Sequence, residues 1–148
     1  MEPILIAYIG VAFMAALSFI ASSYGVTVCG QAVIGSMKKN PGALGTYIAL
    51  SALPSSQGLY GFVAFFILQG YLVPEITMFT AIAILFACLM LGLSGLYANI
   101  RQSQVCANGI VAVGAGHDVF GATMVMAVFP ELYAILALLV TILIAGTL

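Results

Sequence analysis

The sequence predicts an all-α membrane protein, built from four transmembrane helices in two similar hairpins. The chain has 148 residues, of which 64% are hydrophobic and only 5% are charged, and its mean hydropathy is +1.26. Soluble domains carry about 25% charged residues, so a chain this apolar could not cover its own surface in water. Long runs without charge and a likeness between the two halves support the same fold class.

Three runs without a charged residue are each longer than the roughly 20 residues that span a bilayer as a helix. They cover residues 3–37, 40–74 and 76–100, and a fourth run, 119–148, is interrupted only by Glu131. Segments rich in Gly, Pro, Asn or Asp are typical of turns. Such segments separate the runs: MKKNPGALG (37–45), LVPEI (72–76) and VGAGHDVFG (113–121).

The two halves of the chain look like copies of one hairpin. The segment VCGQAVIG (28–35) resembles VCANGIVA (105–112), and GLYGF (58–62) resembles ELYAI (131–135). A repeat of this kind indicates one structural unit that is used twice. We therefore expect a single membrane domain over residues 1–148, with hairpin 1 over 1–73 and hairpin 2 over 74–148.

The few charged residues predict the orientation of the chain. Four crossings put the first and third loops on one side, which receives Lys38 and Lys39, with Arg101 towards the same end of the third helix. The opposite side receives Glu2 and Glu75 and no basic residue. Because basic residues favour the cytoplasmic side, we expect a multi-pass membrane protein with loops 1–2 and 3–4 in the cytoplasm and both termini outside.

Several functions are disfavoured by what the sequence contains. A net charge of −1 without a basic patch argues against nucleic-acid binding. The sequence has no P-loop and no hydrolytic constellation, so we expect no catalysis by the chain itself. Cys29, Cys88 and Cys106 have no paired spacing, and we interpret them as small apolar packing residues.

The acidic residue inside the fourth run is the first candidate for a functional group. Glu131 lies 17 residues from the last residue, which places it near mid-membrane. A charged carboxylate at that depth costs roughly 2.5–3.5 kcal/mol on insertion scales. An acid kept at that cost indicates a functional site; the other interpretation is a protonated acid that donates a hydrogen bond between helices.

A polar stripe on the second helix offers companions for this acid. Leu53, Ser56, Gln57 and Tyr60 are separated by steps of three and four residues and share one helix face. Their side chains supply a hydroxyl, an amide oxygen and a phenol. Pro54 cannot donate to the carbonyl four residues earlier, so it loosens the local helix and lets nearby carbonyls turn away from the axis.

The third helix adds the amide of Gln102 to this set. A carboxylate with several neutral oxygens suits a hard cation that has lost its water. A proton, by contrast, needs only the carboxylate. The residues therefore favour Na⁺ as the bound ion, with H⁺ as the alternative.

These residues carry a family resemblance that covers essentially the whole chain. LPSSQGLYGF (53–62), ELYAIL (131–136) and the duplicated hairpin resemble the membrane rotor subunit of V-type ATPases. This proteolipid is also called subunit K or c, and the resemblance is greatest to its sodium-translocating bacterial type. The resemblance implies that Na⁺ is held by Glu131, Gln57, Ser56, the Leu53 carbonyl and Gln102. It also implies that Tyr60 donates a hydrogen bond to the carboxylate and closes the site.

The resemblance further implies a ring of identical subunits in lipid, with the first and third helices inside and the second and fourth outside. Glu131 would carry its ion through lipid, at a reduced electrostatic cost because the cation neutralises it. The expected partners are the stator subunit (a or I) and the central-stalk subunits. ATP hydrolysis by other subunits would turn the ring.

Two other classes of protein fit part of the sequence. A small secondary exchanger could use Glu131 for transport and bind its substrate at Gln57 and Tyr60. Small multidrug exchangers have four helices, but their acid lies in the first helix, and here it lies in the last. A structural four-helix protein gives no reason for Glu131 and its polar stripe. The mass of the solubilised assembly separates a large ring from a dimeric exchanger.

Overall fold

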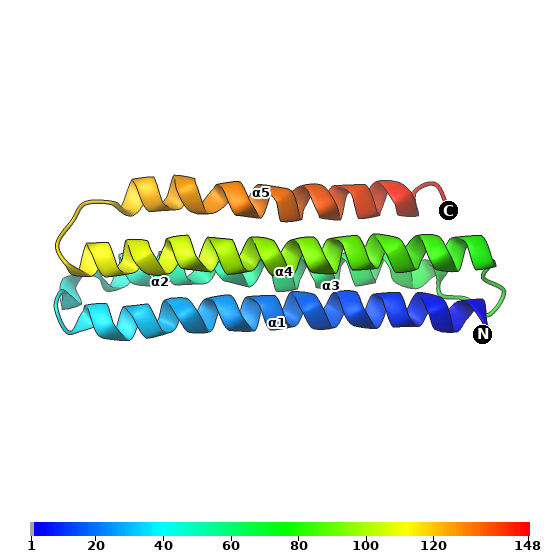
Figure 1. The fold of residues 1–148 in the computed structure, drawn as a ribbon, viewed down its shortest axis with the longest axis horizontal. Coiled ribbons are helices and arrows are strands. Elements are labelled where there is room, and N and C mark those ends of the chain that lie inside the picture. The colour runs from blue at the N-terminus through cyan, green and yellow to red at the C-terminus, as the bar shows by residue number, and fades with distance from the viewer. Residues whose placement is uncertain (1) are drawn as a thin grey trace.

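The computed structural model describes residues 2–148, which form four long helical segments lying side by side (Figure 1). In chain order the elements are α1 (Pro3–Met37), η1 (Pro41–Ala43), α2 (Leu44–Ala52), η2 (Leu53–Ser55), α3 (Ser56–Leu68), η3 (Gln69–Tyr71), α4 (Met78–Gly114) and α5 (Phe120–Ala145). The described residues contain no strand. Four segments are long and apolar enough to cross a membrane, and the second of them runs from η1 to η3. The predicted all-α class with four transmembrane helices is confirmed.

The helix ends follow from local sequence. Pro3 stands at the start of α1, where its missing N–H would have no partner in any case. Thr77 precedes α4 and accepts a hydrogen bond from the backbone N–H of Thr80 at 3.2 Å, which caps the helix. Gly116 has a φ of 92°, a conformation that favours glycine, in the turn between α4 and α5.

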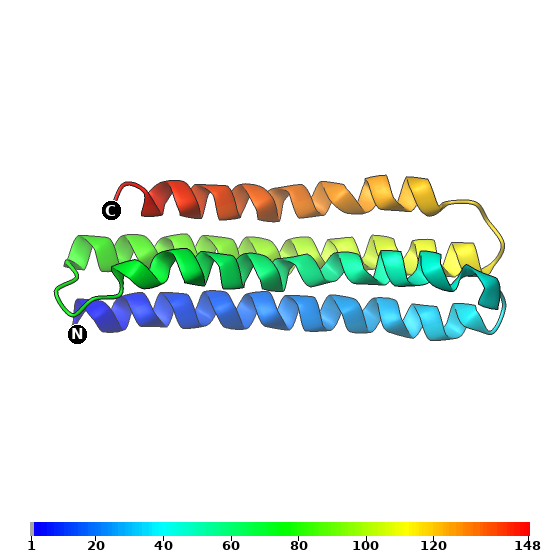
Figure 2. The same cartoon turned by 180° about the vertical axis from the view of Figure 1, so that it is seen from behind.

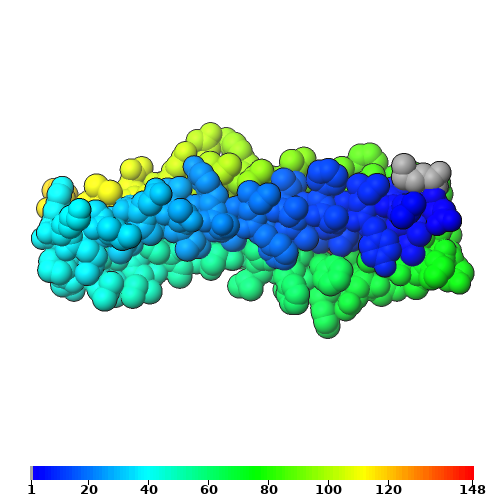
Figure 3. All heavy atoms as spheres, turned by 90° about the horizontal axis from the view of Figure 1, so that it is seen from below, coloured from blue at the N-terminus to red at the C-terminus, as the bar shows by residue number. Residues whose placement is uncertain are grey.

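α1 and α5 each pack against two other segments, whereas the second segment and α4 each pack against three. α1 lies along α4, α4 along α5, and α3 contacts both α1 and α5; the reverse view shows α2 and α3 running between α1 and α5 (Figure 2). One whole face of the bundle is formed by α1, with α2–α3 and α4 on its two sides (Figure 3). Glycine lets the backbones of α1 and α4 approach closely, because a Cβ on Gly10 of α1 would lie only 2.7 Å from the Leu85 Cα of α4.

Both loops that were predicted to share one side lie at the same end of the bundle, and the two termini lie at the other end (Figure 1). Lys38 and Lys39 are at the loop end, directly after α1. Arg101, however, lies 13 residues before Gly114 at the end of α4, or about 20 Å along the helix axis. The two lysines are therefore the permanently cationic residues at this end of the described chain, where His117 also lies.

The interior has two apolar clusters with a polar layer between them. The cluster towards the termini includes Met14, Leu68, Ile84 and Leu91. The cluster towards the loops includes Tyr47, Leu50, Cys106 and Ile110. Buried polar side chains lie between the clusters: Gln57, Asn99, Gln102 and Ser103. Since buried polar groups must find partners inside a membrane protein, this layer is where a functional site is expected.

Candidate functional site

One wall of the polar layer is the break in the second segment. At Pro54 the α-helix gives way to the 3₁₀ turn η2, and α3 begins two residues later, as predicted from the proline. Groups from other helices satisfy the freed backbone. The Ser22 hydroxyl of α1 donates to the Ser55 carbonyl at 3.1 Å and accepts from the Gly58 N–H at 2.7 Å. The Asn99 amide of α4 donates to the Pro54 carbonyl. The break is thereby held in a defined shape.

Glu131 projects from α5 into contact with two other helices. The Tyr60 hydroxyl of α3 donates to its Oε1 at 2.7 Å. The Gln102 amide nitrogen of α4 donates to its Oε2 at 2.8 Å and to the Ala127 carbonyl at 3.2 Å. Each carboxylate oxygen thus accepts one hydrogen bond, and the two donors come from different helices. Glu131 is half-buried, whereas Gln102 is fully buried.

A chain of amides continues from Gln102 across the polar layer. The Gln57 amide nitrogen donates to the Gln102 Oε1 at 3.2 Å. The Gln57 Oε1 in turn accepts from the Asn99 amide nitrogen at 2.7 Å and from the Ser56 hydroxyl at 3.2 Å. The Leu53 carbonyl lies 3.0 Å from the same Ser56 hydroxyl, whose single proton is shared between these two acceptors. The network therefore joins α3, α4 and α5 around one carboxylate.

The structure brings the six residues predicted for the site into one network. Tyr60 and Gln102 contact Glu131 directly, and Gln57 reaches it through Gln102. Ser56 and the Leu53 carbonyl join the network at Gln57, and neither bonds Glu131 within the described chain. Asn99 is a member of this network that was not predicted, and Ser22, which bonds the backbone beside the network, was not predicted either. A signal existed for Asn99, because it stands three residues before Gln102 in an apolar helix and so shares its face.

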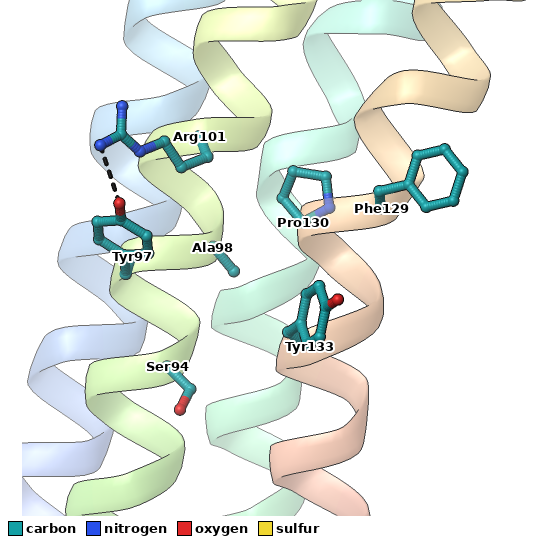
Figure 4. A pocket seen from close by; sticks show the side chains of 7 residues that line it. All are labelled: Ser94, Tyr97, Ala98, Arg101, Phe129, Pro130 and Tyr133. Carbon is teal, nitrogen blue, oxygen red and sulfur yellow. Dashed lines mark hydrogen bonds between the residues drawn. The ribbon is translucent and has the colours of Figure 1, made fainter.

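Arg101 and Pro130 lie beside the site without entering it. The Arg101 side chain extends from α4 away from α5 (Figure 4). Its guanidinium donates to the Tyr97 hydroxyl at 2.9 Å and to the Gln104 Oε1 at 3.2 Å, and it lies 4.9 Å from the centre of the Tyr97 ring. Pro130 sits inside α5, which continues as an α-helix through it. Neither Arg101 nor Pro130 displaces Tyr60 or Gln102, which both donate hydrogen bonds to the carboxylate of Glu131.

Comparison with known proteins adds evidence from the whole chain. The family model for the ATP synthase C subunit matches it twice, over residues 9–68 and 85–144. The chain belongs to the family of the ATP synthase C subunit. The two matches fall in the two predicted hairpins, one in each, which agrees with an internal duplication. Family membership and four apolar helical segments together make the chain an integral membrane protein.

Two relatives in this family carry more specific names. The A-type ATP synthase subunit K of Methanocaldococcus jannaschii is 35% identical over 144 residues, which cover 96% of this chain and 62% of the relative. The V-type sodium ATPase subunit K of Enterococcus hirae is 31% identical over 126 residues, 85% of this chain and 81% of the relative. The recognition of a subunit K proteolipid from sequence is confirmed. Membership of this family also favours a rotor subunit over a small exchanger.

Proposed function

We propose that the chain is an ion-carrying subunit of the rotor ring of a rotary ATPase, and that it carries Na⁺. The observation that carries this proposal is the carboxylate of Glu131, held inside a membrane-spanning helix by Tyr60 and Gln102 from two other helices. Intramembrane acids of this kind mark ion pathways. The subunit itself is not hydrolytic; ATP hydrolysis belongs to other subunits of the complex.

The neighbours of Glu131 support Na⁺ as the cargo. Gln57, Ser56, the Leu53 carbonyl and Gln102 carry neutral oxygens within one connected network, and hard cations prefer oxygen ligands. The Gln57 and Gln102 oxygens accept hydrogen bonds from other amides in this structure, so both amides would turn to bind the ion. Tyr60 would hold the carboxylate in one rotamer while the ion is bound. The name of the Enterococcus hirae relative includes sodium, whereas that of the archaeal relative names no ion. H⁺ is the alternative cargo, because it requires the carboxylate alone.

The ring would place α1 and α4 on the inside and α2–α3 and α5 on the outside, next to lipid. The surface of the single subunit exposes large apolar side chains, such as Phe79 of α4 and Leu143 of α5. In the ring these side chains would face lipid or a neighbouring copy of the subunit. The stator subunit would receive the ion, and the central-stalk subunits would turn the ring. Lys38 and Lys39 favour a cytoplasmic position for the loop end, with both termini outside.

The test is Na⁺ binding to the purified ring, with radioactive Na⁺ at several pH values. We expect wild-type rings to bind Na⁺ more tightly as the pH rises, because protons compete for the same carboxylate. Glu131→Gln keeps the volume and loses the charge, so it should abolish binding and ATP-driven transport while the ring still assembles. Retained transport in that variant would contradict the carrier role.

The same preparation distinguishes Na⁺ from H⁺. Dicyclohexylcarbodiimide attacks protonated carboxyl groups in apolar surroundings, so it should modify Glu131, and mass spectrometry would locate the label. Na⁺ should protect Glu131 from modification if it occupies that carboxylate. Modification without any protection by Na⁺ would identify a proton carrier.

A further inference from the structure

Asn99 is a fully buried polar residue next to the site that the proposed ion-binding set does not include. It lies on α4, with no exposed surface. Its amide nitrogen donates two hydrogen bonds, one to the Pro54 carbonyl and one to the Gln57 Oε1 at 2.7 Å. Asn99 therefore connects the break in the second segment to the amide chain that ends on Glu131.

The direction of the Asn99 amide is fixed by its surroundings. The Pro54 carbonyl can only accept a hydrogen bond, so the nitrogen of Asn99 must face it. The opposite edge of the amide, its Oδ1, lies against α1 at Gly25, where an added Cβ would collide with it. This oxygen is buried and has no hydrogen-bond partner among residues 2–148. Turning the amide over would place that oxygen against the Pro54 carbonyl, which is repulsive.

The orientation of the Asn99 amide also determines the orientation of the Gln57 and Gln102 amides. Because the Gln57 oxygen accepts from Asn99, the Gln57 nitrogen faces Gln102 and donates to its oxygen. The Gln102 nitrogen then faces Glu131, and the Ala127 carbonyl, another group that only accepts, holds it there. Every amide from Asn99 to Gln102 donates towards the carboxylate.

Such a chain of donors suits a carboxylate without a bound cation and opposes a bound cation. The oxygens of Gln57 and Gln102 are both turned away from Glu131, each engaged with the preceding amide. In the proposed site those oxygens are ligands of the cation, because hard cations prefer oxygen ligands. Both glutamine amides must therefore turn over when the ion enters, and the turn breaks the hydrogen bond from Asn99 to Gln57.

We propose that Asn99 is a positioning residue that sets the cation affinity of the Glu131 site. It acts through Gln57, by holding the amide oxygen of that residue away from the carboxylate. The inference rests on the proposed function in taking Na⁺ as the probe ion. Without Asn99, the Pro54 carbonyl loses its donor. The Pro54 carbonyl and the Gln57 Oε1 both accept from the Asn99 amide nitrogen, so the two oxygens are close together. If the Gln57 amide turned over, its nitrogen would be placed to donate to the Pro54 carbonyl in place of Asn99.

The variants that test this role are Asn99→Ala and Asn99→Leu, of which the second keeps a side chain with the same branching and a somewhat larger volume. We expect either variant to bind Na⁺ about two- to tenfold more tightly, the range that corresponds to one net hydrogen bond between neutral groups. Asn108→Ala is the matched control, because Asn108 is exposed on the same helix. It should leave the affinity unchanged.

The measurement is equilibrium binding of radioactive Na⁺ to intact rings at fixed pH, together with the thermal stability of the rings. A purely structural role for Asn99 predicts rings of lower stability with weaker or unchanged Na⁺ binding. Tighter binding is a result that structural damage does not produce. Unchanged or weaker binding in both variants would overturn the inference.

Failure of the proposed Na⁺ function can be distinguished from failure of the inference about Asn99. If wild-type rings bind no Na⁺, that proposal fails by itself. The inference then requires Asn99→Ala to gain protection of Glu131 by Na⁺ against dicyclohexylcarbodiimide, because release of Gln57 supplies the missing oxygen ligand. Absence of that gain would overturn the inference as well.

Discussion

Replacement of Tyr60 by phenylalanine isolates one hydrogen bond of the site. The change removes only the hydroxyl that donates to the Glu131 Oε1 at 2.7 Å and keeps the aromatic ring on α3. A hydrogen bond to a charged group contributes roughly 1.5–3 kcal/mol. If this bond holds the carboxylate in place around Na⁺, its loss should speed Na⁺ dissociation by about tenfold to a hundredfold.

The assay follows Na⁺ leaving the site. Purified rings are loaded with radioactive Na⁺ and diluted into buffer without Na⁺, and the ion that remains bound is collected by rapid filtration. Tyr133→Phe is the matched control, because Tyr133 follows Glu131 by two residues on α5 and is 67% exposed. It loses the same hydroxyl near the same depth, and its dissociation rate should equal that of the wild type.

Two results would refute the reasoning. An unchanged dissociation rate in Tyr60→Phe would mean that this hydrogen bond does not close the site. Equal acceleration in Tyr60→Phe and Tyr133→Phe would mean that the effect comes from a general change in the polarity of the helix surface. In either case the contact between Tyr60 and Glu131 would be a packing feature.

Two further predictions concern the ligands and the packing. Gln57→Leu with Ser56→Ala removes two neutral oxygens and keeps the carboxylate, so Na⁺ affinity at fixed pH should fall about tenfold to a hundredfold for each lost oxygen. The change in ring stability should be smaller, and unchanged affinity would indicate a proton carrier. Gly10→Ala places a Cβ 2.7 Å from the Leu85 Cα, and overpacking of this kind costs about 1–3 kcal/mol, so thermal unfolding should occur at a lower temperature. Gly70→Ala, which meets nothing within 4 Å, should not lower it.

The sequence was sufficient to predict the helices but not how each proline acts. Counted from the start of the two family matches, Pro54 and Pro130 stand at the same position. The same count places Glu131 opposite Ser55, and not opposite Gly58 as the likeness of GLYGF to ELYAI suggested. Pro54 interrupts its helix, whereas α5 continues through Pro130. The break at Pro54 depends on Ser22 and Asn99, which bond the backbone groups that the proline sets free. Those partners come from α1 and α4, so only the packed structure reveals them.

The meeting of Gln102 with Glu131 also depends on tertiary structure. Counted from Ile76, Gln102 comes out about 39 Å along its helix, while Glu131 comes out about 26 Å from the end of the chain. Those counts start from ends that do not coincide, because α4 has 37 residues and α5 has 26. Counted from the turn that joins the two helices, Gln102 is 12 residues before Gly114 and Glu131 is 11 residues after Phe120. In an antiparallel hairpin the shared turn sets the register, and from there the two side chains are level.

The direction of each amide cannot be deduced from residue types alone. A glutamine carries an oxygen and an NH₂ group on one carbon, so the sequence predicts an amide beside Glu131 without saying which end faces it. In the structure the answer comes from two backbone carbonyls, those of Pro54 and Ala127, which can only accept. The same residues can therefore stabilise a bare carboxylate or ligate a cation, and the two arrangements differ by rotation of the Gln57 and Gln102 amides. The ion preference of such a site then depends on what holds the amides, and here that residue is Asn99.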